Sequence, residues 1–276
     1  MDIGTQIAMH ILQIGSQLAE QTRTLVSLIG NTPLEDATAN PVVNTLWGLM
    51  VILADTLLGL AFLLALIQQL YGEFTGRLSL PLSQLLGRLF LSAVLIHLSH
   101  LLGQDLLILM NEMSGILTAN VADFIRQANG GQAAASNQQV VIAAGLSIAF
   151  GASLLRVVFQ AVRRIVFFDV LFILSGPAFV LAFHPQTTAY FAFWARTFVT
   201  TAASQFLQYV TLGMGIAFWT AAQHNGPIGT ILAIAALNLT AEIPTLLSWF
   251  ATSASASVGG VGSLLRNGII ASRLLF

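Results

Sequence analysis

The sequence contains no cysteine and no lysine, and only 8% of its 276 residues are charged. Without cysteine, the chain can form no disulfide, no thiolate metal site and no cysteine nucleophile. Its ten basic residues leave a net charge of −1, which argues against a nucleic-acid-binding surface, since phosphate binding needs clustered cations. A chain with 56% hydrophobic residues also has too little polar surface for a water-soluble globule of this length. The composition therefore predicts helices solvated by lipid.

Long apolar stretches occupy the middle of the chain. We expect an all-α protein, a polytopic membrane helical bundle with about five to six transmembrane helices. An amphipathic N-terminal helix and linker (1–41) precede the bundle (42–251), and a flexible tract with an amphipathic tail (252–276) follows it. The expected spans are 43–70, 83–110, 139–155, 165–183, 197–222 and 228–250.

The regions between these spans have their own patterns. Residues 3–29 repeat apolar positions every three or four residues and predict an amphipathic helix, and 30–41 have the composition of a polar, acidic linker. A second amphipathic stretch is expected near 114–127. Gly176-Pro177 is expected to break the fourth span.

The distribution of arginine predicts the orientation in the membrane. The basic loops near 73–88 and 156–164 fall on one side, which the positive-inside rule makes cytoplasmic. We therefore expect a multi-pass protein of the inner (cytoplasmic) membrane with its N-terminus outside. The tail carries arginine and no acid, so the same rule leaves open its side and the choice between five and six crossings.

Four ionisable residues within the expected spans are candidate pore or intramembrane polar residues: Asp55, Arg88, His97 and Glu242. A charge at bilayer depth is costly, so each is expected to face a partner or water. Asp55 has two interpretations, a packing contact with Arg88 or a place along a polar path. Glu242 lies near Pro244, which can kink its helix.

Other polar residues have simpler interpretations. His97, His100 and Asp105 have a spacing that can hold a metal, but interhelical hydrogen bonding is the preferred interpretation, and we expect no metal and no cofactor. Asp169, five residues after Arg164, is expected to form an ion pair, either local or with another helix. The four tryptophans lie near span ends, as in an aromatic belt. They are Trp47, Trp194, Trp219 and Trp249.

Three arginines at the expected junction of the third and fourth spans are candidates for contact with lipid or with a partner: Arg156, Arg163 and Arg164. No phosphate-binding loop, dinucleotide fingerprint or serine–histidine–aspartate pattern occurs in the sequence. We therefore expect a protein that is not an enzyme, so that any energy for its work comes from another subunit.

One region resembles a known family. Residues 163–222 combine a break at Gly176-Pro177, a second proline at Pro185, an aromatic–Trp194–arginine helix start and an apolar helix bearing Gln205. This arrangement is similar to the central core of TrbL-type conjugal transfer proteins, the polytopic inner-membrane subunits of type IV secretion systems. The similarity covers about residues 156–222 and names no catalytic residue. It makes Pro177, Pro185, Trp194 and Gln205 structural or pore-shaping positions.

The resemblance implies an oligomeric inner-membrane platform or channel that moves DNA or protein substrate and supports pilus assembly. The implied partners are membrane lipid, further copies of the chain, a secretion ATPase and pilus or periplasmic subunits. Two alternatives remain: a small-solute transporter or channel that uses the intramembrane polar residues, and a membrane scaffold subunit that conducts nothing.

Overall fold

The computed structural model describes residues 29–75, 82–128, 137–225 and 227–256. Within these ranges, the chain forms a short 3-10 helix and six α-helices, and none of the described residues lies in a strand. The all-helical class expected from the sequence is thus confirmed. The elements are η1 (Leu34–Asp36), α2 (Pro41–Thr75), α3 (Leu82–Ala128), α4 (Asn137–Ile173), α5 (Ser175–Phe183), α6 (Thr188–Asn225) and α7 (Pro227–Ala256).

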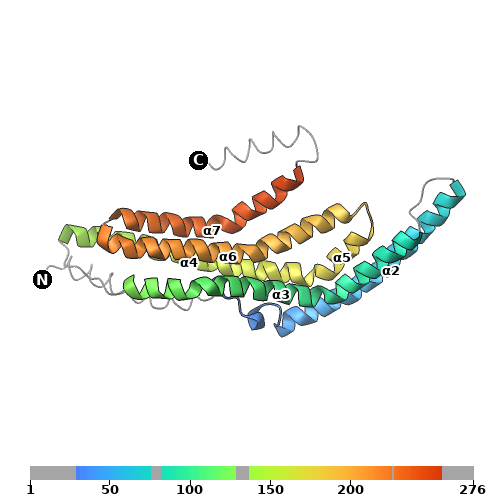
Figure 1. Cartoon of the computed structure of the whole chain (residues 1–276), viewed down its shortest axis with the longest axis horizontal. Coiled ribbons are helices and arrows are strands. Elements are labelled where there is room, and N and C mark those ends of the chain that lie inside the picture. Colours follow the sequence, from blue (N-terminus) through green and yellow to red (C-terminus); the bar gives the residue numbers. More distant parts are fainter. Residues whose placement is uncertain (1–28, 76–81, 129–136, 226, 257–276) are drawn as a thin grey trace.

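The helices build an elongated bundle (Figure 1). Helices α6 and α7 pack against each other, α3 packs on α6, and α4 packs on α7 and α6. At one end, α2 and the first part of α3 extend beyond the other helices as a pair (Figure 1). The short helix α5 packs on both members of this pair.

Three apolar clusters follow one another through the bundle. The first joins α2, α3 and α5 around Ile96 and Phe183. The second joins α3, α4 and α6 around Phe172. The third joins α4, α6 and α7, and it also takes in Ile29 from the segment before α2. The described N-terminal residues are therefore part of the packed interior.

Two of the expected boundaries are absent, because α3 and α4 each run without a break through the region where one was expected. Helix α4 continues through Arg156, Arg163 and Arg164, so the expected basic elbow between a third and a fourth span is wrong. Residues 156–164 contain neither glycine nor proline, and arginine is a good helix former, so no residue there ends the helix. Similarly, the separate stretch expected near 114–127 is the continuation of α3.

A break does occur between α4 and α5, close to the expected Gly176-Pro177. The two helices meet at Leu174 with a bend of 48°. Pro177, the third residue of α5, has no amide hydrogen to donate to the preceding turn. Near the break, Trp194 of α6 donates from its indole nitrogen to the backbone oxygen of Leu171 at 3.1 Å, so a side chain from another helix stabilises the bend.

Three helices are long and apolar enough to cross a membrane, and a fourth span results if the bent pair α4–α5 counts as one. The three are α2, Leu82–Ile116 of α3 and Ile228–Trp249 of α7, and the bent pair covers Ile148–Ile173 and Ser175–Phe183. Helix α6, which includes the expected span 197–222, is not among them, since its many threonine, serine and glutamine residues lower its hydropathy. The expected total of five to six crossings stays a prediction.

The segment expected to be a polar linker enters the bundle instead. Ile29, Thr32, Ala37 and Thr38 are all at most 2% exposed, although Glu35 and Asp36 between them are exposed. Gly30 lies so close to the ring of Tyr209 on α6 that a Cβ atom there would overlap the ring. Apart from Ile29, the expected amphipathic helix over 3–29 lies outside the described residues, as does the tail from 257 onward.

The contact of Gly30 with Tyr209 leads to a stability prediction. Gly30→Ala should lower the stability by about 1–3 kcal/mol, because the added methyl group overpacks a filled site. The unfolding temperature of the purified protein in detergent measures this change. Gly59→Ala is the matched control: no atom lies within 4 Å of its Cβ position, and it removes a glycine from an exposed helix face. Equal unfolding temperatures for the two variants would contradict the packing of residues 29–32 inside the bundle.

Candidate functional site

The centre of the bundle holds a buried arginine. Arg164 on α4 is only 5% exposed. Its guanidinium group donates to Gln208 Oε1 at 2.8 Å and to Thr32 Oγ1 at 3.1 Å, with a longer contact of 3.3 Å to the backbone oxygen of Ile29. All three acceptors are neutral. The positive charge is therefore stabilised by oriented dipoles from α6 and from the N-terminal segment.

The same N-terminal segment is bound from two further helices. Asn111 on α3 pairs with the backbone of Thr32 in both directions: its amide nitrogen donates to the carbonyl at 2.9 Å, and its oxygen accepts from the backbone N–H at 3.0 Å. Gln205 on α6 donates to Asn111 Oδ1 at 2.6 Å and to the backbone oxygen of Gly30 at 3.0 Å. Such partners are needed here because Ile29 and Gly30 end a helical turn, where carbonyls lack helical donors, and 31–33 lie outside any helix.

The network continues to α7. Gln208 Nε2 contacts the backbone oxygen of Thr240 at 3.4 Å, and Thr240 Oγ1 lies 2.9 Å from Thr211 Oγ1. Gln205, Gln208 and Thr240 are each at most 2% exposed. Four helices and the segment at 29–32 are thus joined by one set of buried hydrogen bonds. We call this set the polar core: Thr32, Asn111, Arg164, Gln205, Gln208 and Thr240.

The polar core is closely packed. A cavity of about 10 Å³ beside Arg164, lined by Thr32 and Gln205 among others, has room for at most one water molecule. The expected ion pair of Arg164 with Asp169 is not formed, since the guanidinium group is directed to Gln208 and Thr32. The Oδ1 atom of Asp169 is buried without a hydrogen bond. The side chain of Arg164 lies mostly inside the bundle, with 5% of it exposed, and its contact with lipid or a partner stays a prediction.

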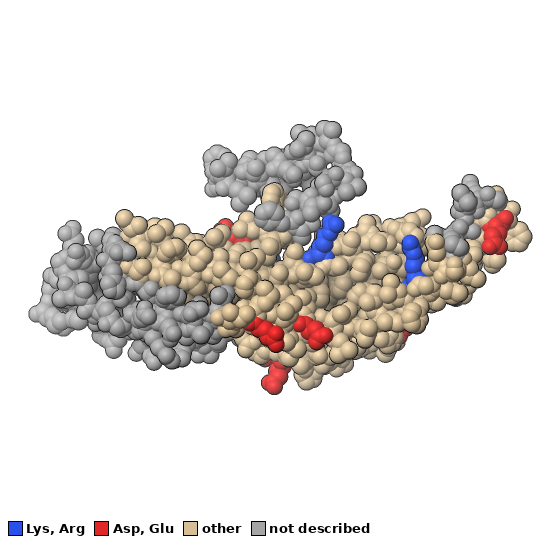
Figure 2. Space-filling view, viewed as in Figure 1, with Lys and Arg blue, Asp and Glu red and all other residues tan. Residues whose placement is uncertain are grey.

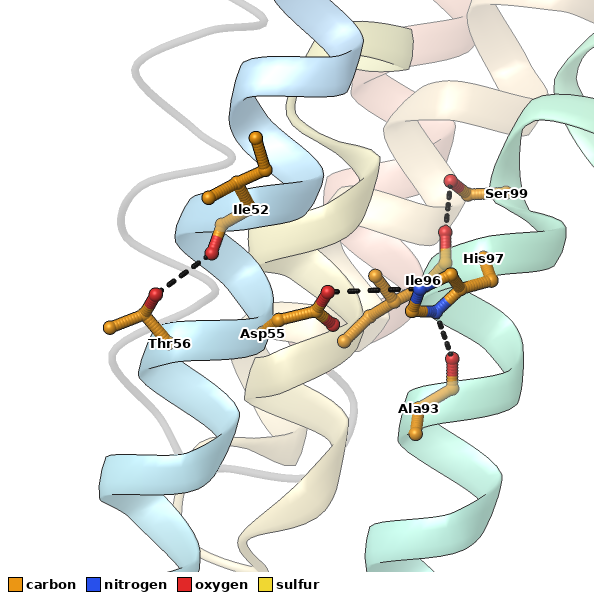
Figure 3. Close-up of polar contacts among 7 residues, drawn as sticks. All are labelled: Ile52, Asp55, Thr56, Ala93, Ile96, His97 and Ser99. Carbon is orange, nitrogen blue, oxygen red and sulfur yellow. Dashed lines mark hydrogen bonds and ion pairs between the residues drawn. The ribbon is translucent and has the colours of Figure 1, made fainter.

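Asp55 and His97 form a pair across α2 and α3 (Figure 3). Asp55 Oδ2 lies 3.7 Å from His97 Nε2, and His97 Nδ1 lies 3.0 Å from the backbone oxygen of Ala93. The sequence offered Arg88 as the partner of Asp55, but the structure pairs it with His97. Nδ1 faces a carbonyl acceptor, so the hydrogen of the ring is assigned to Nδ1, while the 3.7 Å separation of Nε2 from the carboxylate is too long for a hydrogen bond. Both side chains are exposed, Asp55 by 45% and His97 by 63%.

A second exposed pair joins α4 and α7. Arg156 Nη2 lies 3.6 Å from Glu242 Oε1, and Arg156 Nη1 donates to Asn238 Oδ1 at 3.1 Å. The side chains are 56% and 52% exposed. Arg156 and Glu242 lie within the apolar stretches of α4 and α7. On the face drawn in Figure 2, charged side chains are few, and several acidic ones lie near one another at the lower edge.

The four candidate pore residues do not form one group. Asp55 and His97 pair on α2 and α3, Glu242 pairs with Arg156 on α4 and α7, and Arg88 has no hydrogen bond or ion pair among the described residues. Arg163 also has none, although Arg164 beside it has three. The Asp55–His97 and Arg156–Glu242 pairs are both exposed, so they lie on the outside of the protein.

The remaining histidine and tryptophan side chains mostly make packing contacts. His100 Nε2 lies 2.9 Å from Asn44 Oδ1 on α2, and no group of three potential metal ligands occurs among the described residues. Trp47 donates to Ser99 at 3.0 Å and packs on His100 and Phe172. These contacts join α2 to the bundle, and the aromatic belt stays a prediction.

The positions singled out by the family resemblance have separate places. Pro177 lies in the first turn of α5, and Pro185 is exposed in the turn before α6. Trp194 stacks on Phe198 with a centroid distance of 5.2 Å and donates to the backbone at the α4–α5 break. Gln205 belongs to the polar core. Two of the four positions are thus helix-end prolines, and two make buried contacts between helices.

Comparison with known proteins adds no assignment: no family model, curated protein or solved structure matches this chain. The similarity to TrbL-type proteins therefore stays a prediction from the sequence.

The polar core predicts that Arg164 is required for stability. Arg164→Met should lower the stability by about 2 kcal/mol or more, because Gln208, Thr32 and the Ile29 carbonyl lose a donor in an apolar interior. Arg196→Met on α6 is the control, since the side chain of Arg196 is exposed and forms no hydrogen bond or ion pair among the described residues. The measurement is the temperature at which the protein in detergent loses its monodisperse elution peak. The same loss for both variants would contradict a structural role for Arg164.

Proposed function

We propose that this protein is an inner-membrane subunit of a type IV secretion or conjugation machine, in which copies of the chain assemble into a platform or channel. It supports substrate translocation and pilus assembly. The observation that carries the proposal is an exposed acid–histidine pair on an otherwise apolar two-helix surface. The resemblance of residues 156–222 to TrbL-type proteins supplies the kind of machine.

The surface of α2 and α3 has the properties of a contact with more protein. Only 22% of the residues in the apolar stretch of each helix are buried within the protein, and large side chains such as Leu53, Leu60 and Leu98 are exposed. Lipid solvates such a surface well. It solvates Asp55 and His97 poorly, because ionisable groups in a membrane span are costly unless protein or water surrounds them. A neighbouring copy that covers the pair removes this cost.

The pair formed by Arg156 and Glu242 extends the argument to a second surface. It too is exposed and lies within apolar helices, but on α4 and α7 instead of α2 and α3. Each surface presents a polar pair amid apolar side chains, so the surface of one copy can supply hydrogen-bonding partners to the other surface on the next copy. A contact between two different surfaces is heterologous, and its repetition gives a ring when the rotation between successive copies closes.

A platform of this kind depends on partners. The chain has no recognisable nucleotide-binding motif, so the proposal assigns energy supply to a secretion ATPase. Pilus or periplasmic subunits and a transient DNA or protein substrate complete the set. A membrane scaffold that conducts nothing would use the same surfaces, and only a transport measurement separates it from a channel.

The alternative of a small-solute transporter has less support. That function needs Asp55, Arg88, His97 and Glu242 along one polar path. Two of them pair on α2 and α3, the third pairs with Arg156 on a different pair of helices, and both pairs are exposed. These residues therefore support two contact surfaces better than one substrate pathway.

The assembly part of the proposal predicts the effect of removing the exposed pair. The double substitution of Asp55→Leu and His97→Leu should reduce the mass of the oligomer while the protein still inserts, because it removes the polar contact and adds apolar surface. Light scattering of the full chain in mild detergent, together with crosslinking in native membranes, measures the mass. Thr56→Val is the matched control, since the Thr56 hydroxyl group already donates to Ile52 on its own helix at 2.9 Å (Figure 3). A monomeric wild-type protein, or a double variant of unchanged mass, would sink the assembly model.

The type of machine needs a separate test in the host cell. Deletion of the gene should abolish conjugative transfer or secretion, and the deletion strain should also lose its pili. Reintroduction of the wild-type gene should restore transfer and pili. Transfer at the normal rate in the deletion strain would overturn the assignment, whatever the oligomeric state of the protein.

A further inference from the structure

A groove opens between α4, α6 and α7 beside Arg164. Its volume is about 300 Å³, the lower end of the range for small-molecule sites. Gln160 and Arg163 line it from α4, Thr197 and Thr200 from α6, and Thr245 from α7. Arg164 contributes to the floor, where the groove meets the polar core.

The course of α7 explains why the groove is open. Pro244 lies inside α7 and also lines the groove. A proline within a helix removes one hydrogen bond and bends the axis. In Figure 1, the C-terminal part of α7 leaves the side of α6 after running along it, so the two helices separate where the groove lies.

The charges of the groove favour an anion. Arg163 is exposed and has no hydrogen bond or ion pair among the described residues, and none of the groove-lining residues is acidic. The buried guanidinium group of Arg164 adds a positive potential from the floor. An unpaired arginine among the apolar residues of α4 is costly in a membrane, and an anionic ligand would offset this cost.

The hydroxyl groups of the groove favour a ligand that also donates hydrogen bonds. Thr197 donates to the Phe193 carbonyl at 2.8 Å, Thr200 to the Arg196 carbonyl at 2.8 Å, and Thr201 to the Thr197 carbonyl at 2.7 Å. Each hydroxyl hydrogen is thus directed to its own helix, and the oxygen remains as an acceptor. The wall on α6 therefore suits the hydroxyl groups of a ligand, while Arg163 and Gln160 suit its phosphate.

The surroundings of the groove favour a lipid over a soluble anion. Next to Arg163 on α4, Val162, Val166 and Phe167 are 44%, 58% and 47% exposed. Phe193 on the opposite wall is 58% exposed. Acyl chains can lie along this apolar surface while the headgroup occupies the groove, which is how basic pockets between membrane helices bind anionic lipids.

We propose that the groove between α4, α6 and α7 binds the headgroup of an anionic glycerophospholipid, with its phosphate on Arg163 and Gln160 and its hydroxyl groups on the threonines of α6. The site is distinct from the two ion-pair surfaces of the proposed assembly. The lipid joins α4 to the part of α7 that diverges from α6, and so stabilises the bend at Pro244.

Native mass spectrometry of the full chain in detergent tests this proposal. Added phosphatidylglycerol is the probe, phosphatidylcholine is the zwitterionic comparison, and glycerol 3-phosphate represents the soluble headgroup. We expect wild-type protein to retain phosphatidylglycerol more strongly than phosphatidylcholine. Arg163→Gln should weaken retention of phosphatidylglycerol about ten-fold, as expected for the loss of one charge-assisted contact. Arg88→Gln, which removes the same charge from α3, should bind like wild type.

A second variant separates a shaped groove from simple attraction between charges. Thr200→Leu keeps Arg163 but fills the groove and removes a hydrogen-bond acceptor, so it should also weaken the retention of phosphatidylglycerol. This variant tests the proposal even if Arg163→Gln fails to fold. The proposal is overturned if Arg163→Gln and Arg88→Gln bind alike, or if wild-type protein holds both lipids equally. It is overturned in favour of a soluble phosphate site if glycerol 3-phosphate displaces phosphatidylglycerol at equal concentration.

Discussion

A buried arginine that has no acidic partner determines the arrangement of this bundle. In an apolar interior, the charge of Arg164 must be matched by oriented acceptors, and the chain supplies them from Gln208, Thr32 and the Ile29 carbonyl. Contacts between apolar helices alone specify register weakly in lipid, where no hydrophobic force drives the helices together. Hydrogen bonds from Asn111, Gln205 and Arg164 to one short segment fix three helices relative to one another. The fold therefore depends on residues that are polar, in a protein that is mostly apolar.

The sequence could predict part of this arrangement and not the rest. The apolar runs of α2 and α7 predicted those helices well, and Gly176-Pro177 predicted a bend that occurs at Leu174. The sequence alone, however, groups the three arginines of α4 as one basic cluster. The helical phase contains the correct answer: Val157, Ala161, Arg164, Phe168 and Leu171 are three or four residues apart and all buried, whereas Arg156 and Arg163 are off this stripe. An arginine in phase with an apolar stripe indicates a buried side chain.

The burial of Ile29, Thr32, Ala37 and Thr38 had no comparable signal in the sequence. A segment with prolines, asparagines and acids is usually a surface linker, and only its partners make burial favourable here. Those partners are far away in the chain: Asn111 and Gln205 are 79 and 173 residues from Thr32. The sequence singled out Gln205 through the family resemblance, but it gave no reason to connect Gln205 with Asn111, Gln208 or Thr240. Such contacts depend on tertiary structure, and local patterns do not contain them.

The packing of the polar core also bears on the route of any substrate. Inside the polar core, between Thr32, Arg164 and Gln205, there is a cavity of only about 10 Å³, which is far too small for a peptide or a nucleic acid strand. Opening a path there would break the hydrogen bonds that join four helices, and each broken bond would leave polar groups unpaired in an apolar interior. The exposed pairs, Asp55 with His97 and Arg156 with Glu242, lie on outward surfaces instead. A channel made by this protein would therefore run between subunits, and the interior of each subunit would serve as its rigid wall.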